Sequence, residues 1–191
     1  APIMLYKNGL YAAVAQTLSL DGKCDLSGWK QKVQAMKNAK KNVKIAIVGK
    51  YVALRDSYIS LVEAVRHAAG ENGVNAELLW VDSETVTNSN VAKKLKEADG
   101  IIVPGGFGTR GVEGMIAACR YARETGLPYL GICLGMQIAV IEFARDVAGI
   151  KDATSGEFLS ETSGEGHAVI DILPEKKGKK IGRTMRLGEY V

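Results

Sequence analysis

Features that mark several other classes of protein are missing from this chain of 191 residues. No apolar run approaches the ~18 residues that a membrane span requires, and no signal-peptide pattern is present. The three cysteines, Cys24, Cys119 and Cys133, are odd in number and lack the spacing of a metal site. We therefore expect neither a membrane protein nor a disulfide framework nor a bound metal, and we predict a cytoplasmic location.

Most of the chain also has no excess of positive or negative charge. The net charge is +4, yet residues 1–43 alone contain seven lysines and two aspartates, so the remainder is nearly neutral. No aromatic residues alternate with these lysines, and no recognition motif accompanies them. The lysines are typical of a solvated segment, and we expect no nucleic-acid partner.

The leading segment has too little apolar surface to form a core of its own. Residues 2–6 look extended, Leu10–Leu18 has helical spacing, and a second amphipathic helix is predicted after Asp25. We interpret residues 1–42 as the end of a preceding domain with a linker, and residues 43–191 as a separate domain.

From Val43 onward, apolar strands alternate with helical patterns. The predicted strands span 43–48, 74–81, 100–103 and 127–132, a further strand begins at His167, and helices are predicted from Asp56 and over 83–98, 112–125 and 136–147. Such alternation indicates parallel strands joined by helical crossovers. The predicted fold class is α/β, with an open, mostly parallel sheet covered by helices on both faces and incomplete at the C-terminus.

Cys133 occupies the most informative position, where the strand over 127–132 turns directly into a helix. A side chain at such a strand-to-helix turn projects above the sheet, and Gly131 and Gly135 leave room for the tight backbone and for a substrate. The positive potential at the helix N-terminus favours a thiolate. The alternative, a small buried cysteine, is common for isolated cysteines, but the flanking glycines favour a nucleophile.

A glycine-rich loop, Pro104-Gly105-Gly106-Phe107-Gly108, follows the strand over 100–103. Its spacing matches neither a P-loop nor a dinucleotide-binding fingerprint. Because carboxyl ends of parallel strands meet at one sheet edge, the loop should lie near Cys133. We predict that the N–H groups of Gly106 and Leu134 form an oxyanion hole.

These two motifs together resemble those of class I glutamine amidotransferases. The surrounding segments, including Val48-Gly49-Lys50-Tyr51, Ser155-Gly156-Glu157-Phe158 and Thr184-Met185-Arg186-Leu187-Gly188, resemble the glutaminase domain of the CTP synthase family. The resemblance runs from about Val43 to Gly188.

The resemblance implies a glutaminase that releases ammonia from L-glutamine through a Cys133 thioester. The glutamine site would be lined by Gly106, Leu134, Gly135, Met136, Gln137 and Glu157, with Glu157 facing the substrate ammonium. The loop containing Phe107 and Arg110 is tied by the same resemblance to activation by GTP.

The resemblance also implies a longer protein. Its synthetase domain would use ATP and Mg²⁺ to aminate UTP to CTP, the whole would be a homotetramer, and the glutaminase part itself would need no cofactor.

The chain departs from the family at the catalytic base. The family uses a His-Pro-Glu segment, whereas neither His67 nor His167 is followed by Pro-Glu. We expect that segment beyond Val191, so the chain as it stands should hydrolyse glutamine poorly. Two alternatives stay open: the glutaminase of another amidotransferase or related α/β cysteine hydrolase, and a catalytically silent interaction module.

Overall fold

The computed structural model describes residues 2–162 and 164–171, and these fall into two compact units. The first unit comprises Ala1–Val43 and Tyr58–Glu77, and the second comprises Lys44–Ser57 with the described residues from Leu78 onward. The assignment of residues 1–42 to a preceding domain and linker stays a prediction, because these units are defined only by contacts within the chain.

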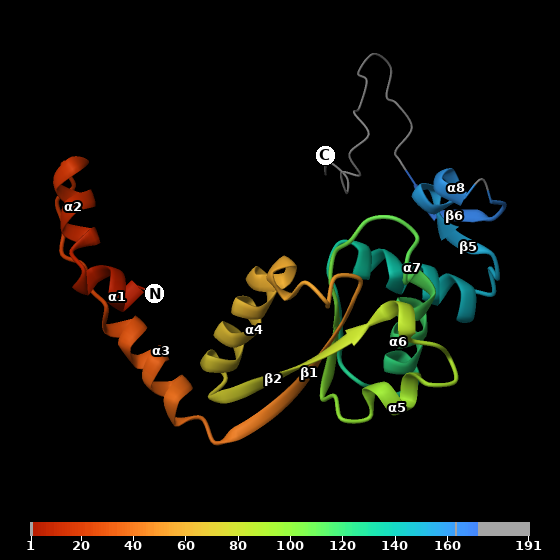
Figure 1. Cartoon of the computed structure of the whole chain (residues 1–191), viewed down its shortest axis with the longest axis horizontal. Helices are drawn as coiled ribbons and strands as arrows, with labels where there is room; N and C mark the ends of the chain where they lie inside the picture. Colours follow the sequence, from red (N-terminus) through yellow and green to blue (C-terminus); the bar gives the residue numbers. More distant parts are fainter. Residues whose placement is uncertain (1, 163, 172–191) are drawn as a thin grey trace, which may run out of the picture. The chain divides into compact units, whose positions relative to one another are not determined.

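The first unit is built from four helices (Figure 1): α1 (Pro2–Lys7), α2 (Leu10–Thr17), α3 (Ser27–Asn38) and α4 (Ile59–Glu71). The extended segment predicted for residues 2–6 is wrong. Proline suits the first position of a helix, where its missing N–H would have no partner, and Pro2 stands there in α1. The cap predicted at Asp25 or Ser27 is wrong, because Leu26 occupies the N-cap position of α3 without a side-chain cap. Asp25 instead accepts a 2.8 Å hydrogen bond from the Ser27 N–H from one residue before that position.

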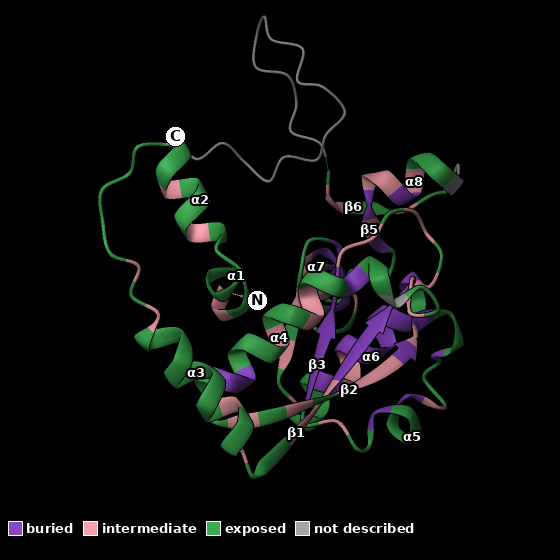
Figure 2. Cartoon of the chain, turned by 60° about the vertical axis from the view of Figure 1, so that its left-hand side comes forward, coloured by how far each residue is buried: buried purple, intermediate pink, exposed green. Residues whose placement is uncertain are grey.

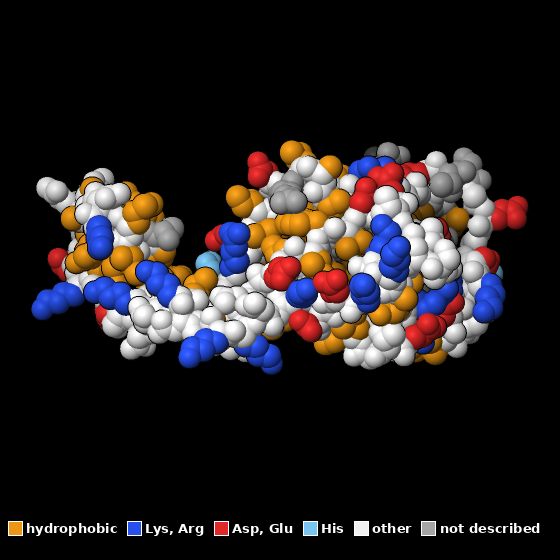
Figure 3. Space-filling view, turned by 60° about the horizontal axis from the view of Figure 1, so that its bottom comes forward, with side chains coloured by type: hydrophobic (Ala, Val, Ile, Leu, Met, Phe, Trp, Pro, Cys, Tyr) orange, Lys and Arg blue, Asp and Glu red, His pale blue; other side chains and the backbone are white. Residues whose placement is uncertain are grey.

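Helices α3 and α4 pack closely at Gly70, where a Cβ would lie 2.4 Å from the Met36 Cγ atom. The Trp29 ring meets the His67 ring edge-on, with centroids 6.4 Å apart, so His67 has a packing role. The described residues of α1, α2 and α3 are all exposed or half-buried (Figure 2). Figure 3 shows hydrophobic side chains exposed among lysines on the N-terminal helices.

The described residues form a four-stranded sheet with the order β2-β1-β3-β4. Its strands are β1 (Lys41–Gly49), β2 (Val74–Asp82), β3 (Gly100–Val103) and β4 (Tyr129–Gly131). β3 pairs in parallel with both β1 and β4, with Ile47 opposite Ile102 and Val103 opposite Gly131. This register brings the ends of β1, β3 and β4 to the same edge of the sheet, and it confirms the predicted α/β fold with a parallel sheet.

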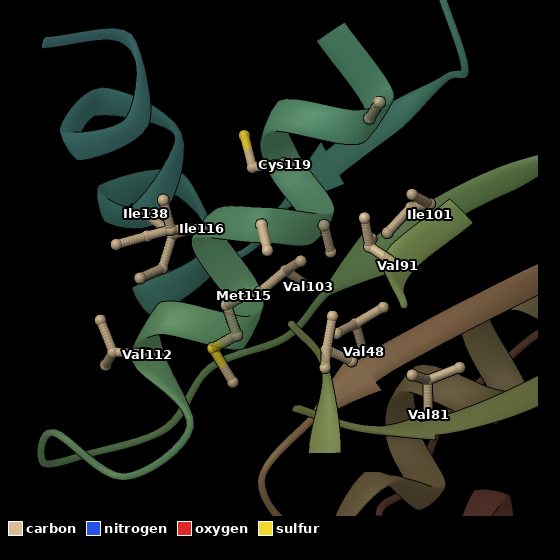
Figure 4. Close-up of a cluster of buried hydrophobic side chains, with 14 of the residues drawn as sticks. Val48, Val81, Val91, Ile101, Val103, Val112, Met115, Ile116, Cys119 and Ile138 are labelled. Carbon is tan, nitrogen blue, oxygen red and sulfur yellow. The ribbon is translucent and has the colours of Figure 1, made fainter. Parts of the chain in front are cut away.

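The core of the second unit lies between the sheet and two helices, α6 (Val112–Thr125) and α7 (Leu134–Asp146). Figure 4 shows Met115 of α6 next to Val103 of β3, and Ile116 of α6 next to Ile138 of α7, all within the same cluster. All four residues of β3 are buried, as expected for a strand in the middle of a parallel sheet. A second, two-stranded parallel sheet contains β5 (Ala153–Ser155) and β6 (His167–Ile170), with α8 (Gly156–Thr162) between them in sequence.

The single helix predicted over 83–98 is wrong. The chain instead forms a short 3₁₀ turn, Ser83–Thr85, and a five-residue helix, α5 (Val91–Leu95). Between them, the Asn90 side chain accepts a 2.9 Å hydrogen bond from the Thr87 N–H and donates one to the Thr85 carbonyl oxygen. Asparagine side chains compete with helical hydrogen bonds in this way, and the pattern of apolar residues does not reveal the competition.

Candidate functional site

Cys133 lies between β4 and α7 with its side chain exposed. Its backbone has φ 54° and ψ −106°, a conformation that L-residues rarely adopt, and it immediately precedes the first residue of α7. Strained backbone of this kind persists only when the surrounding structure enforces it, and it is concentrated at functional sites. The geometry is that of the strand-to-helix turn expected from the sequence.

The two glycines beside Cys133 are required by space. A Cβ on Gly131 would lie 2.4 Å from the Gly135 carbonyl group, and a Cβ on Gly135 would lie 1.9 Å from the Val103 carbonyl oxygen. Such distances are far below any real contact, so a side chain at either position would push α7 away from the sheet. The glycine–x–cysteine–x–glycine pattern therefore seats the start of α7 directly on β3 and β4.

The glycine-rich loop lies against the cysteine, as the sequence predicts. A Cβ on Gly105 would lie 3.5 Å from the Cys133 Cβ, and a Cβ on Gly106 would lie 3.4 Å from Leu134 Cδ2. The register of β3 and β4 explains this, because Val103 is paired with Gly131 and both strands end there. Leu134 is the first residue of α7, so its N–H has no acceptor within the helix.

Lys50 lies at this edge too, directly after the last residue of β1. Its residue is only 4 % exposed, and its ammonium donates hydrogen bonds to the carbonyl oxygens of Phe107, at 2.9 Å, and Gly108. Burial lowers the pKa of the Lys50 ammonium, while the carboxylates of Glu157 and Glu161 act in the opposite direction. A buried cation thus sits beneath the loop that carries Gly106.

Glu157 and Glu161 of α8 contact the N–H groups of the same loop. Glu157 Oε1 accepts from the Gly108 N–H at 3.5 Å, and Glu161 Oε2 accepts from the Thr109 N–H at 3.1 Å. Gly108 has φ 74°, a value that glycine adopts without strain. A Cβ added to Gly108 would lie 3.4 Å from Glu161 Oε2. The structure therefore brings the predicted Glu157 to the loop.

The remaining predicted glutamine-site residues lie in the first turn of α7. Leu134 is 2 % exposed and Gln137 is 5 % exposed, whereas Met136 is half-buried. The backbone N–H groups of Met136 and Gln137 donate to the Cys133 carbonyl oxygen at 3.1 and 3.2 Å. Gly135 is buried against Val103 and fixes the position of this turn.

Phe107 and Arg110, the two residues of the predicted regulatory loop, have different surroundings. Phe107 is 79 % exposed. Arg110 forms an ion pair with Glu84, donates to the Lys50 carbonyl oxygen at 3.3 Å, and lies 5.9 Å from the centre of the Tyr51 ring. The Arg110 guanidinium is thus held beside the end of β1, and the Phe107 ring is open to solvent.

The other cysteines have different environments from Cys133. Cys119 is buried in α6, and this burial, followed by the nearby Glu142 carboxylate, raises the pKa of its thiol to about 11. Burial likewise raises the pKa of Tyr129, whose hydroxyl donates to the Gly135 carbonyl oxygen at 2.8 Å. Cys24 is half-buried in the first unit. Because the pKa of Cys119 is raised to about 11, its side chain is a protonated thiol at neutral pH.

Neither histidine of the chain is placed as a partner for Cys133 by any contact in the described residues. His67 packs on Trp29, and His167 Nδ1 lies 2.7 Å from Asp152 Oδ2. Within residues 2–162 and 164–171, no cluster of three or more histidine, cysteine or acidic side chains could hold a metal. The helices of the same residues include none with the length and apolar composition of a membrane span. Arg186 lies outside the described residues.

Sequence reasoning did not single out Lys50 or Glu161 as parts of the site. Lys50 had one available signal, because a polar residue directly after a buried strand of a parallel sheet lies at the ligand-binding edge. Glu161 had none, since its contact with Thr109 depends on how α8 packs, 52 residues further along the chain.

The comparisons with known proteins all indicate the same family. Residues 53–190 match the model of the family "Glutamine amidotransferase class-I". CTP synthases from Clostridium beijerinckii and Rubrobacter xylanophilus are 52 % and 51 % identical over 99 % of this chain, which spans only about a third of their length (35 % and 34 %). The glutaminase domain of Trypanosoma brucei CTPS, solved with bound acivicin, is 44 % identical, with a TM-score of 0.62 over 68 % of this chain and 50 % of that one. The matched family and the strand-to-helix cysteine agree, and the chain belongs to the class I glutamine amidotransferases.

Proposed function

We propose that Cys133 is the nucleophile of a glutaminase and that its thiol attacks the side-chain amide of L-glutamine. The observation that carries this proposal is the exposed cysteine with φ 54° and ψ −106° at the start of α7. In this conformation the sulfur projects from the turn between two glycines that admit no side chain.

The tetrahedral intermediate would be stabilised by the N–H groups of Gly106 and Leu134. Support comes from the position of Gly106 against Leu134 and from the helix-terminal N–H of Leu134, which needs an acceptor. Loss of one such donor typically costs about 2.7–4 kcal/mol of transition-state stabilisation. The dipole of α7 adds positive potential at the same place.

The bond changes proceed in two steps. Sulfur adds to the amide carbon, the carbon–nitrogen bond then breaks, and the thiol proton leaves on nitrogen, which gives a γ-glutamyl thioester and ammonia. Water then attacks the thioester, so that glutamate leaves and the Cys133 thiol is restored. Glu157 provides a carboxylate for the α-ammonium of glutamine, while the first turn of α7, including Gly135, Met136 and Gln137, lines the substrate pocket.

We further propose that this chain acts within a CTP synthase. Its relatives of that name are about three times as long, so the proposed ammonia acceptor is the synthetase domain of the same protein, where ATP and Mg²⁺ serve the amination of UTP. A homotetramer, activation by GTP at the Phe107–Arg110 loop, and a cytoplasmic location complete the proposal.

Selective labelling tests the assignment of Cys133. The chain is incubated at neutral pH with a diazoketone analogue of L-glutamine, and each cysteine peptide is quantified by mass spectrometry over time. Cys133 should be labelled much faster than Cys24 and Cys119, and the D-enantiomer of the reagent should react slowly with all three. Equal labelling of the three cysteines would contradict the proposal and favour a silent interaction module.

The longer protein permits a second test through Cys133→Ala. This substitution should abolish glutamine-dependent CTP formation and leave ammonia-dependent CTP formation largely intact. Loss of both activities together would contradict the proposed division of labour.

A further inference from the structure

Two successive peptide groups of the glycine-rich loop are held at both ends. The Phe107–Gly108 peptide accepts from Lys50 Nζ through its oxygen, at 2.9 Å, and donates to Glu157 through its N–H, at 3.5 Å. The next peptide accepts from Lys50 through the Gly108 oxygen and donates to Glu161 through the Thr109 N–H, at 3.1 Å. One ammonium holds both oxygens, and two carboxylates of α8 hold both N–H groups.

This pattern fixes the orientation of the loop because of the geometry of the peptide bond. In a planar trans peptide the C=O and N–H bonds point in opposite directions, and the described residues contain no cis peptide. Lys50 and the two glutamates therefore bind the loop from opposite sides. Rotation of either peptide plane would break a hydrogen bond at each end, and backbone groups left without a partner away from water cost free energy.

The held segment directly follows Gly106. The Lys50 stem also touches this residue, since a Cβ on Gly106 would lie 3.4 Å from Lys50 Cδ and 3.7 Å from Lys50 Cε. Lys50 is 4 % exposed, so the ammonium gives up most of its hydration in order to reach the two carbonyl oxygens. Burial disfavours the charged form of the Lys50 side chain and lowers its pKa. Because a buried charge adds little or nothing to stability, a role of Lys50 other than stabilising the fold is expected.

We propose that Lys50 and Glu161 are positioning residues that hold the glycine-rich loop and the adjoining Thr109. In this position the Gly106 N–H stays directed at the carbonyl oxygen of the group that acylates Cys133. This inference rests on the proposed function. Transition-state stabilisation by a backbone N–H requires a preorganised donor, and a displacement of about 1 Å can cost about 100-fold in rate. Neither residue touches the reacting atoms, so their effect would be transmitted through the main chain of the loop.

Two reactions of the same thiol separate positioning from other roles. Acylation of Cys133 by the γ-(4-nitrophenyl) ester of L-glutamate passes through a tetrahedral oxyanion, and its nitrophenolate leaves without needing a proton donor. Alkylation of Cys133 by iodoacetamide displaces iodide at a saturated carbon, so no oxyanion forms. The full chain is used, with nitrophenolate release and the iodoacetamide rate at Cys133 measured for each variant.

The variants are Lys50→Met, Glu161→Ala and Glu161→Gln. Lys50→Met should slow acylation by at least about 10-fold, and Glu161→Ala by up to about 10-fold, as expected for lost hydrogen bonds that align a donor. Glu161→Gln keeps an oxygen acceptor for the Thr109 N–H and should retain the parent rate. Alkylation should be unchanged in all three. Glu161 is exposed, so its variants remain informative even where Lys50→Met fails to fold.

The matched controls are Lys44→Met and Glu97→Ala. Each breaks an exposed ion pair of the second unit, in which Lys44 Nζ lies 2.7 Å from Glu97 Oε2. Both should keep the parent rates. If the parent chain is alkylated but not acylated, the proposed function fails. Three results would overturn the positioning role although the parent is acylated. The Lys50 and Glu161 variants could match the parent rate, or acylation and alkylation could fall together in a variant. The third such result is a Glu161→Gln variant that is acylated as slowly as Glu161→Ala.

Discussion

Replacing Gly135 by alanine tests how tightly α7 is seated on β3. The added Cβ would lie 1.9 Å from the Val103 carbonyl oxygen and 2.8 Å from its carbonyl carbon. An ordinary carbon–oxygen contact is about 3.3 Å, so the shortfall is about 1.4 Å. Val103 is completely buried in the middle of the sheet, so its backbone cannot move aside. The first turn of α7 must therefore lift from the strand and carry Cys133 with it.

The cost has two components. Overpacking of this kind typically destabilises by about 1–3 kcal/mol, and the better helix propensity of alanine returns about 0.5–1 kcal/mol. We expect Gly135→Ala to lower the free energy of unfolding by about 1–2 kcal/mol. The effect on chemistry should be larger, because a displacement of about 1 Å at the nucleophile costs about 100-fold in the acylation rate.

Urea unfolding followed by linear extrapolation measures the first quantity, and nitrophenolate release from the L-glutamate γ-aryl ester measures the second. Gly105→Ala serves as the stability control, because its Cβ would meet the Cys133 Cβ at an ordinary 3.5 Å. That variant should stay within about 0.5 kcal/mol of the parent free energy of unfolding. A Gly135→Ala chain with parent stability and parent acylation would refute the claim that this contact sets the position of Cys133.

Three further predictions concern buried ionisable groups. Because burial raises the pKa of Cys119 to about 11, iodoacetamide should leave this thiol unmodified at neutral pH in the folded chain and modify it once urea unfolds the protein. Arg123→Met should lower the free energy of unfolding by about 3 kcal/mol in urea titrations, since the buried Glu142 carboxylate would lose hydrogen bonds of 2.8 and 3.0 Å. Burial lowers the pKa of Lys50 in the folded state, so the unfolded state holds this proton more tightly, and stability should rise as the pH increases from the folded to the unfolded pKa of Lys50. Lys50→Met should remove that alkaline increase from a series of urea titrations, and an unchanged pH dependence would contradict the assignment.

The arrangement of the strands and the meeting of the two motifs were predictable from the sequence for a physical reason. Buried parallel strands have continuous apolar runs, as in Gly100–Val103, and their carboxyl ends share one edge. A glycine-rich loop after one strand and a cysteine after its neighbour must then be close, and Val103 is indeed paired with Gly131. The glycines around Cys133 gave a second signal, because only a tight strand-to-helix turn excludes side chains at both positions.

Other features depend on contacts that no local pattern contains. The contacts of Lys50 with Phe107 and Gly108 join residues 57 and 58 positions apart, and nothing in the sequence near Lys50 specifies them. The helix predicted over 83–98 is interrupted because the Asn90 side chain hydrogen-bonds to the backbone of Thr85 and Thr87, and these bonds are not visible in the pattern of apolar residues. The extended segment predicted over residues 2–6 is instead a helix that begins at Pro2, because proline is favourable at the first helical position.

The central claim is that Cys133, lifted at the start of α7, accepts a γ-glutamyl group from its substrate. Rapid quenching in acid after a pulse of the L-glutamate γ-aryl ester, followed by tandem mass spectrometry, locates the acyl group directly. We predict a γ-glutamyl adduct on Cys133, with Cys24 and Cys119 unmodified and no adduct in Cys133→Ala. An adduct distributed over the other cysteines, or a parent chain in which Cys133 stays free while the ester is consumed, would contradict the account.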